Sequence, residues 1–489
     1  MMPEQKLVKG VPIRPMITGL WQMADQERDG KSFDLERAAE ALVEYARAGF
    51  DTFDMADHYG SAEIVAGMAR RRLIESGDPA PTIMTKFCPP PGPMDIGVVR
   101  KGVETALQRL NMDCVDIMQF HWWRYEDARY LDALEALQQL REEGLVRAIG
   151  LTNFDAGHLD LISRSGIEVA TNQVSFSLVD RRAAGDLSDV AQAQDVALLA
   201  YGTLCGGFLS DRYGGVADPE IADWSRKKYR RFIAQAGGWP AFQQLLDCLA
   251  GIATRHNVSI SNVATRWVLD HQAVAAVIVG ARLGENQHRD DNLKLFSFAL
   301  DTADRKAISA AVGKMTTIPG DCGDEYRRPP FLTASGDLSH HLDALPPIFE
   351  TVPSPAKSSV QQAKSGSIWE AAAGFSRAVR TGNRILVSGT TATDAKGNCV
   401  CPGDAGAQAQ YILDKILAAI DSLGGRREDV IRTRIYMTDT AQWEAVSIAH
   451  RRVFGEVAPA NTLIGISELI GDGYLVEIEA EADIGNGSD

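Results

Sequence analysis

The chain has 489 residues, of which 45% are hydrophobic and 24% are charged. This length predicts two or more domains, and this composition is typical of a globular protein with a sizeable core. The formal net charge of −15 argues against binding to nucleic acid or to an anionic membrane surface, because both require a basic patch. No apolar run is long enough to span a bilayer, and the first residues lack the apolar region of a secretory signal.

The seven cysteines are scattered along the chain, and their spacing matches neither a zinc-binding pattern nor a redox pair. We therefore expect no metal site and no disulfide framework. A reducing compartment, the cytoplasm, is the expected location.

Strand-like and helix-like segments alternate from about residue 16 to about residue 300. Apolar residues recur on one face over 96–110, which predicts an amphipathic helix there. Eight strand–helix units over roughly 300 residues favour a (β/α)8 TIM barrel over an open sheet. An open dinucleotide-binding sheet would show G-x-G-x-x-G after its first strand, and this fingerprint is missing. The expected strands are 16–20, 49–54, 82–86, 115–120, 146–151, 169–174, 197–201 and 275–279.

Two stretches interrupt this alternation. The segment 210–240, between the seventh and eighth expected strands, is placed to cover the barrel mouth and shape a pocket. From about residue 316 prolines break the pattern, so residues 318–366 are expected to be a linker that follows a barrel domain of residues 1–317. Periodic strands and helices then return and predict a smaller α+β domain over residues 367–489.

Four polar residues stand at or just past the ends of three consecutive expected strands. Asp54 and Tyr59 follow the second strand, Lys86 ends the third, and His121 follows the fourth. Each residue alone could simply satisfy backbone groups or face solvent. Because strand ends converge in a barrel, the four are expected to share one site.

These side chains point to acid–base chemistry on a carbonyl group. Tyr59 is a poor acid at neutral pH, but an ammonium group from Lys86 would favour the phenolate, and Asp54 can hold Lys86 charged. His121 can donate a hydrogen bond to a substrate oxygen, which Tyr59 would then protonate. Since no activated nucleophile or metal-ligand set accompanies them, hydride from a nicotinamide is the expected source of reactivity.

Four motifs, in this order along the chain, resemble the aldo-keto reductases: GFDTFDMADHYG, MTKF, QFHWW and GLTNF. The resemblance covers about residues 10–300 and implies a (β/α)8 barrel that binds NAD(P)H without a Rossmann fold. It also implies that Asp54, Tyr59, Lys86 and His121 form a catalytic tetrad.

The same resemblance implies a site for the nicotinamide. Asn153 and Gln173 would hydrogen-bond its carboxamide, and Tyr201 would stack on its ring. Trp21 and Trp122 are expected either to form walls of the substrate pocket or to be aromatic residues of the core.

At the adenosine end of the cofactor the resemblance implies Gly280, Arg282 and Asn292. Arg282 would lie near the 2′-phosphate and Asn292 near the adenine. Because a guanidinium group suits phosphate, NADP (as NADPH) is expected in preference to NAD.

The region from about residue 367 to 484 resembles the Rid/YjgF reactive-intermediate deaminase family. The matching motifs include LVSG at 386–389, DVIRTRIY at 429–436 and VEIE at 476–479. This resemblance implies a chorismate-mutase-like fold, trimers with clefts between subunits, and hydrolysis of enamines and imines.

The cleft residues expected in this second domain are Arg377, Arg434, Asn461 and Glu477. Deaminases of the family hold a substrate carboxylate with an arginine directly after a Pro-Ala pair, and Asn461 occupies that position here. An amide cannot supply a charged bidentate contact, which argues against deaminase activity. Arg377 or Arg434 could replace the charge, and Glu477 either matches the acidic cleft residue or lies on a solvated face.

We therefore expect an NAD(P)H-dependent oxidoreductase that reduces a small aldehyde, ketone or related imine, fused to a Rid-like domain that forms trimers. Two alternatives stay open. The barrel could be a cofactor-binding scaffold with little turnover, or the Rid-like domain could be the main catalyst, an imine or enamine hydrolase.

Overall fold

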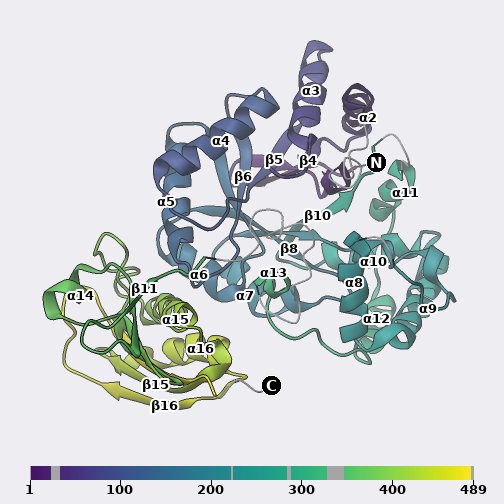
Figure 1. Cartoon of the computed structure of the whole chain (residues 1–489). Helices are drawn as coiled ribbons and strands as arrows, with labels where there is room; N and C mark the ends of the chain where they lie inside the picture. The colour runs from purple at the N-terminus through teal and green to yellow at the C-terminus, as the bar shows by residue number, and fades with distance from the viewer. Residues whose placement is uncertain (1, 24–33, 222–223, 284–287, 328–345, 486–489) are drawn as a thin grey trace.

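The computed structural model describes residues 2–23, 34–221, 224–283, 288–327 and 346–485 (Figure 1). Eight parallel strands close into a barrel in the order β10-β3-β4-β5-β6-β7-β8-β9. The predicted (β/α)8 fold is confirmed, and each observed strand overlaps one of the eight predicted strands. The barrel strands are β3 (Met16–Gly19), β4 (Thr52–Asp54), β5 (Thr82–Phe87), β6 (Val115–His121), β7 (Val146–Thr152), β8 (Val169–Ser175), β9 (Ala197–Tyr201) and β10 (Val274–Gly280).

Helices surround the barrel, and the helix predicted over 96–110 is confirmed. Helix α4 (Ile96–Leu110) begins after Asp95, whose side chain accepts hydrogen bonds from the N–H groups of Gly97 and Val98, as a helix cap does. The other helices of this part are α2 (Leu35–Arg47), α3 (Ala62–Glu75), α5 (Arg129–Glu142), α6 (Ala156–Arg164), α7 (Asp186–Ala193), α8 (Trp224–Gln235), α9 (Gly238–His256), α10 (Ile260–Leu269), α11 (Arg289–Leu293), α12 (Thr302–Val312) and α13 (Asp324–Arg327).

An antiparallel hairpin that the sequence did not predict closes one end of the barrel. It consists of β1 (Lys6–Val8) and β2 (Val11–Ile13), and Val11 and Ile13 are fully buried in a cluster with residues of the barrel strands. The carboxyl ends of the strands therefore form the accessible mouth, where barrel enzymes carry their active sites.

The C-terminal part is a seven-stranded sheet in the order β11-β12-β13-β14-β17-β15-β16. The predicted linker over 318–366 is corrected in part, because β11 pairs with β12 and β12 pairs with β13, so both strands belong to this sheet. They were missed because they are short and lie in a proline-rich stretch. The elements are β11 (Glu350–Pro353), β12 (Val360–Lys364), α14 (Ile368–Ala373), β13 (Ala378–Thr381), β14 (Arg384–Thr391), α15 (Ala405–Ser422), β15 (Val430–Met437), α16 (Trp443–Phe454), β16 (Ala460–Gly465) and β17 (Val476–Asp483).

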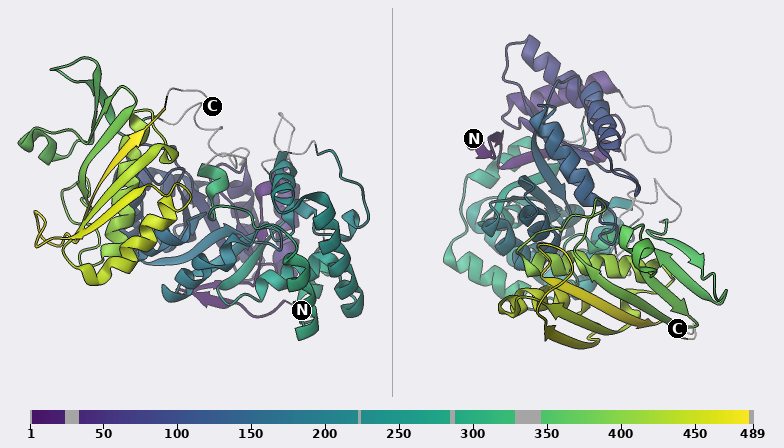
Figure 2. Two further views of the ribbon diagram at one scale, coloured as in Figure 1. Left: turned by 90° about the horizontal axis from the view of Figure 1, so that it is seen from below. Right: turned by 90° about the vertical axis from the view of Figure 1, so that its left-hand side faces the viewer.

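The two parts of the chain share an interface. Helices α15 and α16 cover one face of the sheet and lie between that sheet and the barrel (Figure 2). Helix α15 packs on α6, and Asp414 of α15 accepts a hydrogen bond of 3.0 Å from Nε2 of His158 on α6. No helix in the described part of the chain is long and apolar enough to cross a membrane.

Candidate active site

A buried ion pair lies at the mouth of the barrel, between the ends of β4 and β5. Nζ of Lys86 donates to both carboxylate oxygens of Asp54, at 2.9 and 2.7 Å, and to the carbonyl oxygen of Met55 at 2.9 Å. Both side chains are almost fully buried. The ammonium group also lies 5.0 Å from the ring centroid of Tyr59, on the loop that follows β4. The structure thus brings together three of the four residues that sequence reasoning placed in one site.

Two glutamines complete the surroundings of Asp54. Nε2 of Gln119 and Nε2 of Gln173 each donate to Oδ1 of Asp54 at 2.7 Å, and Nε2 of Gln173 also lies 2.8 Å from Oε1 of Gln119. Gln119 was missed by the sequence analysis, although a glutamine in the middle of an apolar strand was a visible signal. Gln173, expected at the nicotinamide carboxamide, has its amide nitrogen committed to Asp54.

His121 is the fourth residue of the predicted set, and it lies in the same cavity. Nδ1 lies 3.2 Å from the carbonyl oxygen of Thr152, which can only accept, so Nδ1 carries a proton. Burial, together with the charge of Arg327, lowers the pKa of His121 well below its usual value, so the ring is neutral. Nε2 is then an acceptor, and it has no hydrogen-bond partner among the described residues. The expected role of His121 as a hydrogen-bond donor to a substrate oxygen stays a prediction, and it requires the other tautomer or a protonated ring.

A cavity of about 780 Å³ extends from these residues across the mouth. Trp21 lines it and packs edge-on against Tyr59, with ring centroids 4.9 Å apart. Trp122, the other expected wall, is fully buried and donates from Nε1 to the carbonyl oxygen of Asp127, whereas the neighbouring Trp123 lines the cavity. The implied cofactor residues all line it: Asn153, Gln173, Tyr201, Gly280, Arg282 and Asn292.

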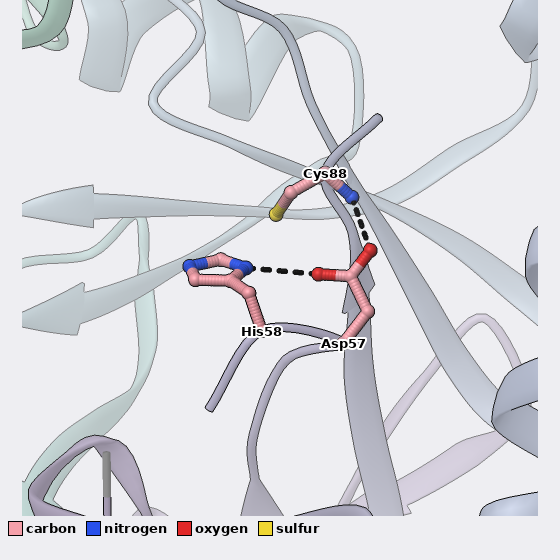
Figure 3. Close-up of side chains that lie close together, drawn as sticks. All are labelled: Asp57, His58 and Cys88. Carbon is pink, nitrogen blue, oxygen red and sulfur yellow. Dashed lines mark hydrogen bonds and ion pairs between the residues drawn. The ribbon is translucent and has the colours of Figure 1, made fainter. Parts of the chain in front are cut away.

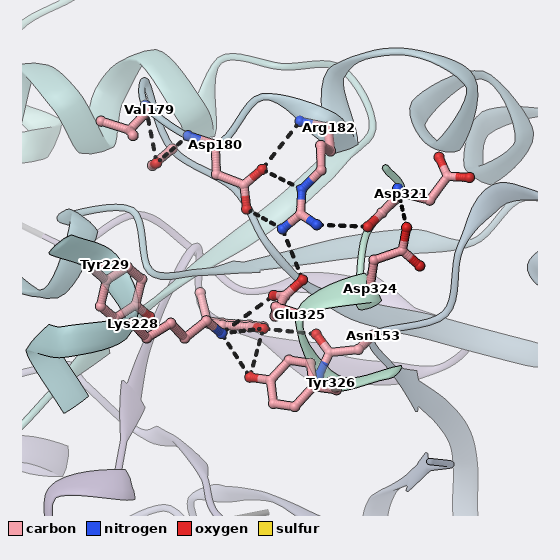
Figure 4. Close-up of polar contacts among 12 residues, drawn as sticks. Asn153, Val179, Asp180, Arg182, Lys228, Tyr229, Asp321, Asp324, Glu325 and Tyr326 are labelled. Carbon is pink, nitrogen blue, oxygen red and sulfur yellow. Dashed lines mark hydrogen bonds and ion pairs between the residues drawn. The ribbon is translucent and has the colours of Figure 1, made fainter. Parts of the chain in front are cut away.

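A second polar group at the mouth comes from outside the barrel strands. Lys228 of helix α8 donates to the hydroxyl of Tyr326 at 2.8 Å and pairs with Glu325 at 3.3 Å, and Glu325 also pairs with Arg182 (Figure 4). Burial opposes these charges, but Tyr326 and Glu325 raise the pKa of Lys228 well above its usual value. Arg182 and Lys228 in turn lower the pKa of the buried Glu325 to about 2. Sequence reasoning missed this group, because Tyr326 stands in the aperiodic stretch that follows the barrel.

The loop after β4 is tied to the end of β5 by Asp57 (Figure 3). Its carboxylate lies 2.8 Å from Nδ1 of His58 and accepts a hydrogen bond from the backbone N–H of Cys88 at 2.9 Å. Within the described part of the chain, Asp57, His58 and Cys88 are the residues whose potential ligand atoms lie close enough to hold a metal ion, all within 4.8 Å. Because both oxygens of Asp57 already accept hydrogen bonds, this contact accounts for the loop geometry without a metal.

The residues expected in a Rid-type cleft are divided between two places. Arg377 is buried and donates to the carbonyl oxygen of Gly389 at 2.9 Å. Burial raises the pKa of Glu477, and the charge of Arg377 opposes this rise only in part. Arg434 instead pairs with Glu479 at 2.7 Å on an adjacent strand. Asn461 donates from Nδ2 to the hydroxyl of Thr433 at 2.9 Å, and this hydroxyl also lies 2.9 Å from Nε2 of His450. Asn461 is therefore engaged within its own subunit.

A closed (β/α)8 barrel with a buried ion pair at its mouth is an arrangement typical of barrel enzymes. Residues 15–312 match the model of the aldo/keto reductase family, so the chain belongs to that family. Residues 366–484 match the model described as endoribonuclease L-PSP, and they form a Rid/YjgF domain.

Three similar proteins illustrate these matches. Pyridoxal reductase, chloroplastic, of Arabidopsis thaliana is 25% identical over 327 residues, which cover 63% of this chain and 86% of that protein. An uncharacterized protein of Streptomyces coelicolor is 38% identical over 124 residues, covering 25% of this chain and 91% of that one. The structure of the glycerol dehydrogenase from Gluconobacter oxydans superimposes with a TM-score of 0.54 at 23% identity, covering 66% of this chain and 97% of that chain, and supports the fold. Family membership and the similarity to the pyridoxal reductase support an oxidoreductase that acts on carbonyl compounds.

Proposed function

We propose that the barrel reduces an aldehyde or ketone with NAD(P)H and that Tyr59 donates the proton. The observation that carries this proposal is the buried Lys86–Asp54 pair beside Tyr59, at the wall of a cavity of about 780 Å³. A nicotinamide bound in the cavity would supply the hydride.

The donors and acceptors of the cavity fit that cofactor. Asn153 and Tyr201 lie together at one part of the wall, and Arg282 and Asn292 also line it. Arg282 favours the 2′-phosphate of NADPH over NADH, because a planar guanidinium binds phosphate through two hydrogen bonds.

The chain's own residues divide the acid–base work. Asp54 keeps the ammonium group of Lys86 charged in a buried position, and that charge stabilises negative charge on the Tyr59 oxygen after proton transfer. Nε2 of the neutral His121 can accept a hydrogen bond from the hydroxyl of the product alcohol once Tyr59 has delivered the proton.

The first test replaces the proton donor. Tyr59→Phe removes one oxygen atom, and kcat with a panel of aldehydes and ketones is expected to fall by about 100-fold or more, the usual contribution of a general acid. The dissociation constant for NADPH should stay the same, because the hydroxyl is assigned to the chemical step. Wild-type rates in the variant would refute the assignment of Tyr59, and parallel assays with NADH give the cofactor preference.

We also propose that the Rid-type domain assembles the chain into a trimer in the cytoplasm. Apolar side chains exposed on its sheet support the assembly, and the seven free cysteines fit a reducing compartment. Deaminase activity is not part of this proposal, because Asn461 supplies an amide where a charged contact to a carboxylate is needed. Absence of ammonia release by Tyr59→Phe protein from imines of amino acids would agree with an assembly role.

A further inference from the structure

The segment that follows the barrel, residues 320–327, returns to the mouth and contacts the backbone of Asn153. Arg327 donates to the carbonyl oxygen of Asn153 at 2.6 Å and to that of Trp122 at 2.8 Å. Gly323 has a φ of +90°, and a β-carbon on it would collide with the same carbonyl oxygen of Asn153. Asn153 itself has a left-handed φ of 61°, and its N–H donates to Gln173. The α13 segment, residues 320–327, thus holds a strained backbone position that faces the cavity.

A directional chain of hydrogen bonds runs from the same segment to the side chain of Asn153. Tyr201 donates to Oδ1 of Asn153 at 2.8 Å, so the Tyr201 oxygen is free to accept. The Tyr326 hydroxyl lies 3.1 Å from it, and Lys228, which can only donate, lies 2.8 Å from Tyr326. Protons therefore point from Lys228 to Tyr326, from Tyr326 to Tyr201, and from Tyr201 to Asn153. With Oδ1 used as an acceptor, the NH2 group of Asn153 is the part of the amide left to donate to a ligand.

The charges in this region balance, so Lys228 is not arranged to attract an anion. Arg182 pairs with Asp180 at 2.8 Å and with Glu325 at 2.9 Å, and Lys228 pairs with Glu325. All four side chains are at least nine-tenths buried. Two cations and two anions leave no net charge in this group, and Lys228 donates to the hydroxyls of Tyr326 and Tyr201, at 2.8 and 3.4 Å.

We propose that Tyr326 and Lys228 are positioning residues for the nicotinamide carboxamide, acting through Tyr201 and Asn153. This inference rests on the proposed nicotinamide site. The chain fixes the Asn153 amide with its NH2 group available to the carboxamide oxygen, before the cofactor binds. The α13 segment is therefore part of the reductase site, although it follows the last helix of the barrel in sequence.

The test measures the binding of NADPH and NADP+ to Tyr326→Phe and to the wild type. Quenching of the protein fluorescence reports the binding. The substitution removes one hydroxyl and leaves Lys228 its contact with Glu325. We expect the dissociation constant to rise about three- to tenfold, as for loss of one net hydrogen bond. The KM for cofactor should rise in parallel while the unfolding midpoint changes little, a split that a merely structural role would not produce. Tyr474→Phe is the matched control, because its hydroxyl accepts from Thr393 in the second domain, and it should leave cofactor binding unchanged.

A second pair of variants tests the contact between the α13 segment and the Asn153 backbone. Gly323→Ala and Gly77→Ala both place a side chain at positive φ, but a β-carbon at Gly77 has nothing within 4 Å. Only Gly323→Ala should weaken cofactor binding, because only it pushes the segment away from Asn153. Unchanged cofactor binding in both Tyr326→Phe and Gly323→Ala would overturn the positioning role. If the wild-type protein binds neither NADPH nor NADH, the proposed function itself fails, which is a distinguishable result.

Discussion

Asp54 accepts hydrogen bonds from three side chains at the mouth of the barrel. It is buried, and its carboxylate accepts from one ammonium group and from two amide nitrogens, those of Gln119 and Gln173. A buried charge is stable only when it is paired and hydrogen-bonded, and this residue is both. The same set of contacts fixes Lys86 in one place, so the electrostatic environment of Tyr59 is preorganised by strands rather than by loops.

Removing the charge of Asp54 should therefore cost stability as well as activity. In Asp54→Asn the ammonium group of Lys86 stays buried without an anionic partner, and we expect the free energy of unfolding to fall by about 3–5 kcal/mol. Denaturant titration measures this change. Asp78→Asn is the control, because Asp78 pairs with Arg47 at 2.9 Å near the surface, and loss of such a pair should cost less than about 1 kcal/mol. Equal losses in the two variants would contradict the importance given to the buried pair.

At the scale of single residues, the sequence predicts the position of side chains at the ends of strands. It does not predict the position of side chains that tertiary packing places. Lys86 and His121 could be predicted because the strand period fixes where β5 and β6 end. Trp122 and Trp123 could not be told apart, because the alternation of faces stops at the strand end and the loop decides which ring enters the cavity. Tyr326 gave no signal at all, since its segment has no periodicity and is held by side-chain contacts with α8 and β9.

Among the elements, the contact between α6 and α15 places His158 at the boundary between the two domains. Asp155 caps α6 by accepting from the N–H of His158, and its carboxylate also lies 2.8 Å from Nδ1 of the same residue. Asp414 of α15 lies on the other side of the ring, 3.0 Å from Nε2. The ring also stacks on Tyr125, with centroids 3.4 Å apart. His158 therefore takes part both in an ion pair within α6 and in the domain contact, to which Arg124–Asp421 and Arg164–Asp404 also contribute.

This contact predicts a loss of stability at alkaline pH. Burial alone lowers the pKa of a histidine, but Asp155 and Asp414 raise the pKa of His158 to about 9. Since the pKa in the unfolded chain is about 6.5, the protonated histidine stabilises the fold fully below that pH and loses its contribution as the pH rises through 9. The maximal effect is roughly 3 kcal/mol. The thermal unfolding midpoint should therefore fall between pH 6.5 and 9.5 in the wild type and fall much less in His158→Gln. Parallel curves for the two proteins would contradict the pairing.

Elements with long periodic segments were predicted well, and short ones were not. Helix α4 has the predicted bounds because its apolar face repeats over several turns. Strands β11 and β12 have only four and five residues and depend on pairing with each other and, for β12, with β13, so their own sequence carries little signal.

For the whole molecule, the proposed site of association between copies of the chain is the face of the sheet turned away from α15 and α16. Leu386, Ile431 and Ile464 lie on strands β14, β15 and β16, and each is more than 40% exposed. Exposed apolar side chains gathered on one sheet are typical of a surface that another subunit covers. Burying this surface in a trimer would also bring three barrels into one particle. In each chain, α15 and α16 would separate the barrel from the buried sheet face.

The mass in solution tests this arrangement. The chain has a mass of 53.1 kDa, and light scattering after size exclusion should give about three times that value for the wild type. Leu386→Glu combined with Ile464→Glu should give the mass of one chain, because two charges would be buried without partners in the assembled state. Ile74→Glu serves as the control, since Ile74 is 47% exposed on α3 in the barrel and should leave the assembly intact. A wild-type protein that already has the mass of one chain, or a double variant that stays assembled, would exclude this sheet face as the interface.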